Sequence, residues 1–238
     1  METHHPRFLV FRGGAIGDFI CTLPAIQALR DRWPEAYIEL VGYPHIANLA
    51  VASGLVQKVQ SLDQASMAHL FVPHREWENQ WEEFIRSYDV VINYLHDPGG
   101  VVCENLERAG AKQVIAGSPI PGGRHAAEHL MEPLGALALF NDHPEPRIHL
   151  EPAYRDAGRA WLEKAGLDHF VALHPGSGSP GENWPWPGFR VVDELLTRSG
   201  HMGVFILGEA GDPLREAGVE PSGRRPLLEG LSLVEVAG

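Results

Sequence analysis

The sequence predicts an α/β protein built from two doubly wound units, each a mostly parallel sheet covered by helices on both faces. Short apolar runs alternate with longer helical patterns along the chain, which is typical of parallel sheets. An apolar run ends in a glycine-rich turn twice, at 11–18 and at 174–180. Prolines and charges interrupt the pattern over 141–156 and predict a boundary there. We therefore expect one domain over 1–150 and a second over 151–238.

The strands of the first domain are predicted from brief runs rich in Val, Ile, Leu and aromatic residues, bounded by Gly, Pro or Asp. These runs cover 7–12, 36–42, 56–62 and 89–95. Apolar residues at helical spacing predict a helix over 23–33 and a second over 74–88. The second helix carries an aromatic stripe, which is more typical of a packed face than of a cofactor site. Its members are Trp77, Trp81, Phe84 and Tyr88.

The second domain repeats this pattern in a shorter form. Apolar runs within 169–174, 202–209 and 225–230 predict strands, residues 184–200 predict a helix, and Ser232 is placed to cap another. Only 238 − 150 = 88 residues follow position 150, fewer than a five- or six-stranded doubly wound domain needs. We expect the second domain to be incomplete, with an open sheet edge that favours self-association.

Composition restricts the partners and the compartment. Subtracting 31 acidic from 19 basic residues gives a net charge of −12, which opposes broad binding to nucleic acid or to anionic lipid. No run approaches the roughly 18 apolar residues of a membrane span, and the first residues lack the apolar core of a signal peptide. Cys21 and Cys103 lie far apart and fit a reducing compartment as small buried residues. We therefore expect a cytoplasmic protein without a transmembrane segment.

The first glycine-rich turn, FRGGAIGD at 11–18, is a weak match to a dinucleotide fingerprint. Gly14 and Gly17 fit the last two glycines of G-x-G-x-x-G, but Arg12 stands where the first glycine belongs. This departure disfavours a nicotinamide-dependent oxidoreductase.

Asp18, which ends this turn, has two interpretations. It suits the start of a helix, where free backbone N–H groups and the helix dipole favour a negative charge. A carboxylate would repel a pyrophosphate, so a functional Asp18 is expected to face a neutral group that can lose a proton, such as a sugar hydroxyl. In another arrangement Asp18 belongs to the turn, and Thr22 caps a helix that has Pro24 in its first turn.

Two further groups of residues carry polar side chains at informative spacing. The stretch HAAEH at 125–129 matches the H-x-x-E-H pattern of zinc peptidases, although a third ligand is not assigned by the sequence. His96 and Asp97 close the strand at 89–95, where a polar pair either contacts a ligand or simply ends the strand. His174, before Pro175, fits a residue that supports the second glycine-rich loop better than a catalytic one.

Three stretches together resemble the family 9 glycosyltransferases, the heptosyltransferases of lipopolysaccharide core assembly. They are FRGGAIGDFICTLPAIQALRDRWPEAYIELVGYP at 11–44, DVVINYLH at 89–96 and ALHPGSGSPGENWPWPGF at 172–189. The resemblance implies a GT-B architecture, in which two Rossmann-like domains face a cleft. It places the acceptor in the amino-terminal domain and the nucleotide sugar in the carboxyl-terminal one.

The resemblance also implies roles for single residues. Asp18 matches the aspartate taken as the general base of inverting transfer. Gly14 and Gly17 would let the backbone approach the acceptor, and His96, Arg124 and His125 are expected to contact it, Arg124 or His125 meeting its anionic groups. The second loop would hold the donor diphosphate through backbone N–H groups and hydroxyls, with Glu209 on the ribose. The expected donor residues are Ser177, Gly178, Ser179 and Glu209.

These roles predict transfer of a heptose-like sugar from an ADP-linked donor to a lipid-linked or oligosaccharide acceptor, at the inner face of the membrane and without a metal or other cofactor. The alternative is a non-catalytic or partner-dependent remnant that binds the acceptor. Glu182 favours that alternative, because it stands where the family usually has a basic residue and would weaken binding of a diphosphate.

Overall fold

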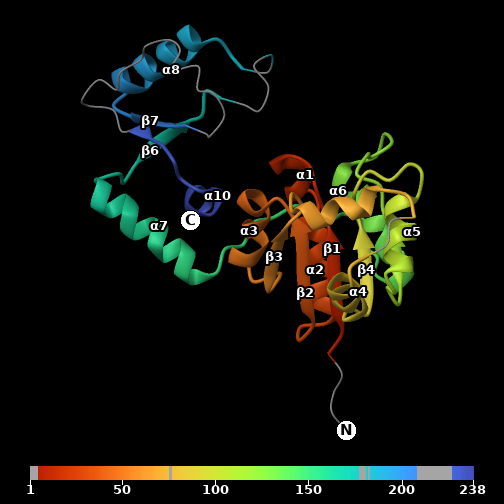
Figure 1. Ribbon diagram of the computed structural model, residues 1–238. Helices are drawn as coiled ribbons and strands as arrows, with labels where there is room; N and C mark the ends of the chain where they lie inside the picture. The colour runs from red at the N-terminus through yellow and green to blue at the C-terminus, as the bar shows by residue number, and fades with distance from the viewer. Residues whose placement is uncertain (1–4, 75–76, 177–180, 182, 208–226) are drawn as a thin grey trace. The chain divides into compact units, whose positions relative to one another are not determined.

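The computed structural model describes residues 5–74, 77–176, 181, 183–207 and 227–238 (Figure 1). The chain folds into two compact units, unit 1 over Met1–Glu151 and unit 2 over Pro152–Gly238. The division falls one residue after the boundary that the sequence predicts.

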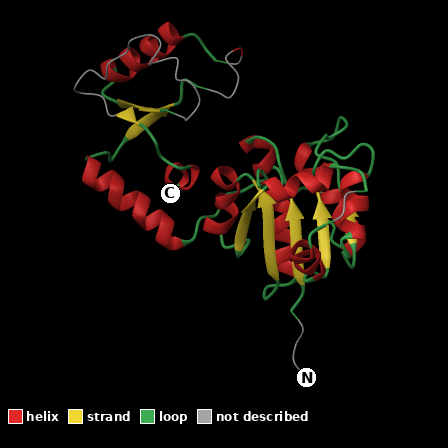
Figure 2. Ribbon diagram, in the orientation of Figure 1, coloured by secondary structure: helices red, strands yellow, loops and turns green. Residues whose placement is uncertain are grey.

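Unit 1 contains a five-stranded parallel sheet in the order β3-β2-β1-β4-β5 (Figure 2). Four of its strands confirm the predicted runs, while the sequence pattern missed β5, which has three residues of which one is buried. The strands are β1 Arg7–Phe11, β2 Tyr37–Gly42, β3 Lys58–Ser61, β4 Val90–Asn93 and β5 Val114–Ala116.

The helices of unit 1 connect these strands. The helix predicted over 23–33 is confirmed as α2, whereas the one predicted over 74–88 begins only at Asn79, because Glu78 before it is extended. The helices are α1 Ile16–Ile20, α2 Leu23–Arg32, α3 Pro44–Ala52, α4 Asn79–Arg86, α5 Val101–Arg108 and α6 Ala126–Met131, with 3-10 helices η1 Ala65–Phe71 and η2 Glu132–Leu137.

Both faces of the sheet are buried, as expected for apolar strands of a parallel sheet. Leu9 and Phe11 of β1 belong to a core cluster with residues of η1, α4 and α5. On the alternate positions of β1, Phe8 is buried and its ring centroid lies 5.1 Å from that of Trp33, which follows α2. The aromatic stripe packs into or against the core cluster, which confirms its interpretation as a packed face.

The strand order creates a switch point between β1 and β4. The chain moves outward from β1 through β2 to β3, and then returns to the other side of β1 to form β4 and β5. The last residues of the two central strands, Phe11 and Asn93, are partners in the ladder. Their following loops therefore leave the sheet side by side, where open α/β sheets bind their ligands.

One charged residue, Glu39, is buried in the interior of β2. Its carboxylate accepts hydrogen bonds from the hydroxyls of Tyr88 at 2.6 Å and Tyr37 at 2.9 Å, and from the amide of Gln60 at 2.6 Å. Lys58 Nζ lies 3.2 Å away. Burial raises the pKa of Glu39, but these hydrogen bonds outweigh it and hold the pKa below its usual value.

Unit 2 is a second parallel α/β unit. Among its described residues the strands pair in the order β6-β7-β8, and the predicted strands, the predicted helix and the Ser232 cap are confirmed. The helix α7 was not predicted, because none of its side chains is buried and it starts in the stretch taken as a boundary. The elements are α7 Pro152–Ala165, β6 Phe170–Leu173, α8 Trp186–Arg198, β7 Met202–Ile206, β8 Leu227–Leu228 and α10 Leu233–Ala237.

A small core joins the strands of unit 2 to α8. Leu173, Phe205 and Leu207 form it, and Trp186 and Phe189 pack against it. Within the described residues of both units, no helix is long and apolar enough to cross a membrane.

We predict that Glu39→Ala lowers the free energy of unfolding at pH 7 by about 1–3 kcal/mol, because the buried hydroxyl of Tyr88 and the half-buried hydroxyl of Tyr37 lose their acceptor. The folded-state pKa of Glu39 is depressed, so its contribution is complete above the pKa of the unfolded chain and is lost as the pH falls through the folded-state pKa. The difference between parent and variant should therefore shrink in acid. Urea unfolding at pH 7 and below pH 4 measures it.

Glu83→Ala, which removes an exposed carboxylate from α4, is the matched control and should change stability little. Equal effects of the two substitutions at pH 7 would contradict the assignment of Glu39 as a stabilising buried acceptor.

Candidate functional site

The loops that follow β1, β4 and β5 leave the sheet at one edge, which we call the carboxyl edge of unit 1 (Figure 1). The first loop leads into α1 and Asp18, the second contains His96, and the third leads through Arg124 and His125 into α6. The predicted acceptor residues, which span more than 100 positions of the sequence, thus follow strands that end at the same edge.

Asp18 lies in the first turn of α1, where its Oδ2 accepts a hydrogen bond from the backbone N–H of Ala15 at 3.1 Å. The side chain is 56% exposed, so the carboxylate is held on one side and open to a ligand on the other. Thr22 occupies the cap position of α2, with Pro24 in the first turn. Asp18 therefore lies at the start of a helix, as the first interpretation has it, and not in the turn. Thr22 stands at the N-cap position of the next helix, but its hydroxyl donates to the carbonyl oxygen of Asp18 and does not cap that helix.

The two glycines of this loop differ in what they permit. Gly14 has φ +100°, a left-handed conformation, and a Cβ built on it would lie 3.0 Å from Asp18 Oδ2. Gly17 is inside α1, and a Cβ there would meet nothing within 4 Å. Gly14 is therefore required for the position of the Asp18 carboxylate, whereas Gly17 leaves space on the surface of the loop.

Arg12, the first residue after β1, stands out in the sequence only because it replaces the first glycine of the dinucleotide fingerprint. Its structural role is not predicted. Arg12 is 3% exposed. Its Nε donates to Thr22 Oγ1 at 2.9 Å, its Nη2 donates to the carbonyl oxygen of Asp18 at 3.0 Å, and its Nη1 donates to that of Tyr94 at 3.4 Å. The guanidinium thus joins the loop after β1 to the loop after β4. A charged residue at the end of an otherwise apolar strand was the signal for it.

His96 is exposed in the loop between β4 and α5, and the residues around it fix that loop. Asn93, which is fully buried, accepts the backbone N–H of Leu95 through Oδ1 at 3.0 Å. Asp97 accepts the backbone N–H groups of Val102 and Cys103 at 3.1 and 3.0 Å, which caps the start of α5. Asp97 therefore serves the helix, and His96 is the exposed side chain of the pair.

Arg124 and His125 precede α6 on the third loop. Arg124 Nη1 lies 3.3 Å from Glu132 Oε2 in an exposed ion pair, and His125 Nδ1 accepts the backbone N–H of Ala127 at 3.3 Å. His129 Nε2 lies 2.9 Å from the carbonyl oxygen of Ser118. These contacts use one ring nitrogen of each histidine in the HAAEH stretch. The described residues contain no group of three metal-ligating side chains, so they do not support the zinc interpretation.

The predicted donor residues Ser177, Gly178, Ser179 and Glu209, and also Glu182, lie outside the described residues. His174, at the start of the second glycine-rich loop, is among the described residues. His174 Nδ1 lies 2.7 Å from the carbonyl oxygen of Ile206, so this ring ties the end of β6 to the end of β7. That contact agrees with the structural role expected for His174.

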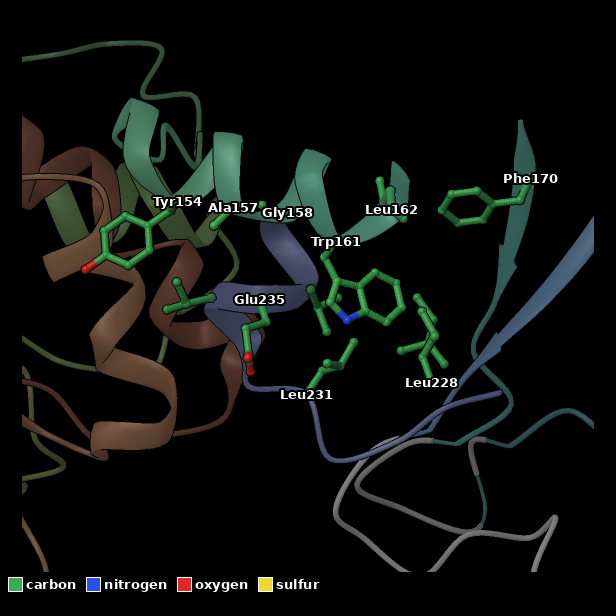
Figure 3. A pocket seen from close by; sticks show the side chains of 13 residues that line it. Tyr154, Ala157, Gly158, Trp161, Leu162, Phe170, Leu228, Leu231 and Glu235 are labelled. Atoms are coloured by element: carbon green, nitrogen blue, oxygen red, sulfur yellow. The ribbon is translucent and has the colours of Figure 1, made fainter. Parts of the chain in front are cut away.

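Unit 2 also contains a cavity of about 330 Å³ between α7, α10 and the ends of β6 and β8 (Figure 3). Its walls are mostly apolar, and its carboxylate, Glu235, accepts hydrogen bonds from the backbone and hydroxyl of Ser232. A cavity with these walls does not offer the polar groups that a diphosphate needs. The lining includes Tyr154, Trp161, Leu162, Phe170, Leu228 and Leu231.

Comparison with solved structures identifies the class of fold. The chain is similar to a glycosyl transferase family 9 protein from Veillonella parvula, with 20% identity, a TM-score of 0.74, and coverage of 100% of this chain and 74% of that one. It is also similar to E. coli ADP-heptose lps heptosyltransferase II, with 14% identity, a TM-score of 0.69, and coverage of 97% and 75%.

A third solved structure, E. coli heptosyltransferase WaaC with ADP-2-deoxy-2-fluoro heptose, is 18% identical with a TM-score of 0.65, over 97% of this chain and 78% of that one. No protein-family model and no curated protein matches the chain. The likeness is one of fold, and the two parallel α/β units of this chain agree with it. It bears out the fold class and the resemblance that the sequence predicts.

The difference between the two glycines gives a matched pair of substitutions. We predict that Gly14→Ala lowers the free energy of unfolding by about 1–2 kcal/mol, because a left-handed residue gains a Cβ, and that it displaces the Asp18 carboxylate. Gly17→Ala should leave stability unchanged or raise it by up to about 1 kcal/mol, because alanine favours the helix. Urea unfolding and the Asp18 carboxyl resonance measure the two effects. Equal destabilisation by both would contradict the distinct roles of the two glycines.

Proposed function

We propose that the protein is a glycosyltransferase that moves a heptose-like sugar from an ADP-linked donor to an acceptor of lipopolysaccharide-core type, with inversion at the anomeric carbon. One observation carries the proposal: the Asp18 carboxylate lies at the carboxyl edge of unit 1, held by the backbone on one side and open on the other. The fold likeness to structures named as heptosyltransferases supports it.

In this proposal Asp18 is the general base. An acceptor hydroxyl gives its proton to the carboxylate while its oxygen forms a bond to the anomeric carbon. The bond from that carbon to the diphosphate breaks at the same time, and the diphosphate leaves with the electron pair. A carboxylate is a weak base, so its effect depends on being correctly placed as the proton leaves.

The acceptor would bind along the carboxyl edge of unit 1. Gly14 and Gly17 give the loop a surface without side chains, so that a sugar can approach the backbone. His96 and His125 present exposed rings that can hydrogen-bond hydroxyls. The ion pair of Arg124 with Glu132 is exposed and therefore weak, so an anionic group on the acceptor can replace Glu132 as its partner.

The donor would bind unit 2 through residues assigned from the sequence. Backbone N–H groups and hydroxyls at Ser177, Gly178 and Ser179 suit a diphosphate, and Glu209 suits ribose hydroxyls. The scheme assigns no metal to the chain, because oriented backbone dipoles are proposed to stabilise the departing diphosphate. We place this reaction in the cytoplasm, at the inner face of the membrane.

We predict that Asp18→Asn lowers kcat about 100- to 10,000-fold, because the amide keeps the hydrogen bond from Ala15 but cannot accept the proton. The dissociation constant of the acceptor should change little. Turnover is measured as ADP released from ADP-heptose, together with the mass gained by a deacylated lipopolysaccharide core that lacks heptose, and affinity is measured by calorimetry.

Asp31→Asn is the control, because it removes an exposed carboxylate at the carboxyl end of α2, away from the loop that carries Asp18. It should leave kcat unchanged. Equal turnover by the parent and Asp18→Asn would contradict the role of Asp18. Acceptor binding without turnover in the parent would favour the non-catalytic alternative.

A further inference from the structure

We propose that Arg12 is a positioning residue: its buried guanidinium fixes the segment that carries Asp18 against the ends of β1 and β4. This inference rests on the proposed function for its effect on catalysis, but its structural part concerns contacts that are independent of any substrate.

Every nitrogen of the Arg12 guanidinium faces an acceptor on a different segment. Nε reaches Thr22 at the start of α2, Nη2 reaches the carbonyl oxygen of Asp18, and Nη1 reaches the carbonyl oxygen of Tyr94 after β4. Because the guanidinium is planar and rigid, these three acceptors are held in one fixed arrangement. A lysine, a point charge on a flexible stem, cannot satisfy all three in the same way.

The Asp18 carbonyl oxygen is anchored twice. It accepts from Arg12 Nη2 at 3.0 Å and from the hydroxyl of Thr22 at 2.9 Å, and that hydroxyl in turn accepts from Arg12 Nε. The three residues therefore form a closed ring of hydrogen bonds beneath the loop. Since this ring fixes the main chain of Asp18, it restricts the positions that the exposed carboxylate can occupy when a ligand binds.

The carboxylate of Asp18 favours the charged form of the buried Arg12. Burial lowers the pKa of Arg12, and the negative charge of Asp18 is the largest effect that raises it again. Nη2 and Asp18 Oδ1 lie 3.9 Å apart, an ion pair rather than a hydrogen bond. The cation is 3% exposed while the carboxylate is 56% exposed, so water and ligands reach the carboxylate and not the arginine.

Unit 1 contains a matched arginine that performs only a structural task. Arg30 of α2 donates to the carbonyl oxygens of Leu55, Pro34 and Ala36 and to Gln57, and burial lowers its pKa as well. These contacts lie at the end of α2 that leads into β2, away from the carboxyl edge. Replacing Arg30 therefore measures how much stability is lost when an arginine that is hydrogen-bonded to carbonyl groups is removed. The contacts of Asp18 are left in place.

The test compares the parent chain of 238 residues with Arg12→Met, Arg12→Lys and Arg30→Met. Backbone hydrogen exchange is followed in peptides that cover 14–22, and kcat and KM are measured with ADP-heptose and the deacylated core acceptor. We expect Arg12→Met to speed exchange within 14–22 and to lower kcat about 100-fold, the effect of a small misplacement of a reacting group. Arg12→Lys should fall between it and the parent in both measurements, because its ammonium can satisfy only part of the three acceptors.

Arg30→Met should destabilise the fold but leave kcat and exchange within 14–22 as in the parent. The inference is overturned if Arg12→Met and Arg30→Met have the same kcat, or if Arg12→Met exchanges within 14–22 like the parent. Should Arg12→Met fail to fold, Arg12→Lys takes its place in both comparisons. If the parent has no turnover, the proposed function fails, and exchange alone decides: faster exchange in the Arg12 variant but not in Arg30→Met supports the inference, and equal exchange overturns it.

Discussion

The buried guanidinium of Arg12 is the interaction on which the carboxyl edge of unit 1 depends. An arginine that is 3% exposed is costly unless its donors are satisfied, and here they are satisfied by backbone carbonyls and a hydroxyl from the segments that meet at the switch point. Parallel strand order brings the loops after β1 and β4 together. The guanidinium holds these loops together by its hydrogen bonds, while the carboxylate of Asp18 stays exposed.

Several polar residues near this edge support the backbone and leave a smaller set to meet a ligand. Asn93 and Asp97 are occupied by the turn after β4 and by the start of α5. Gly14 provides the left-handed turn that Asp18 needs. Of the predicted acceptor residues with side chains, Asp18, His96 and His125 are exposed, and Arg124 is in a weak surface pair. This division between supporting and exposed groups is the physical basis for proposing an acceptor site here.

Much of the fold could be predicted from the sequence, because both faces of the sheet are buried and runs such as FLVF and VVIN are therefore continuously apolar or nearly so. β5 and α7 were missed, since β5 is only three residues long and α7 begins within the proline- and charge-rich stretch that predicts a boundary. The sequence placed Asp18 at the end of the turn after the first strand and His96 directly after the strand at 89–95. It did not place His125 beside them, because β5, the strand before it, was missed. It assigned Arg12 no role, because the partners of a buried arginine are set by tertiary contacts. For the same reason it left Asp97 open between contacting a ligand and simply ending the strand, and it did not predict that Asp97 caps α5.

A sugar acceptor that binds at the carboxyl edge of unit 1 would be detected most directly by an NMR titration of the labelled protein with a deacylated lipopolysaccharide core that lacks heptose. We predict saturable shifts in the backbone amides of 12–18, 94–97 and 117–125, which belong to the loops after β1, β4 and β5. Shifts confined to the opposite edge of the sheet, or none at saturating acceptor, would contradict an acceptor site at the carboxyl edge.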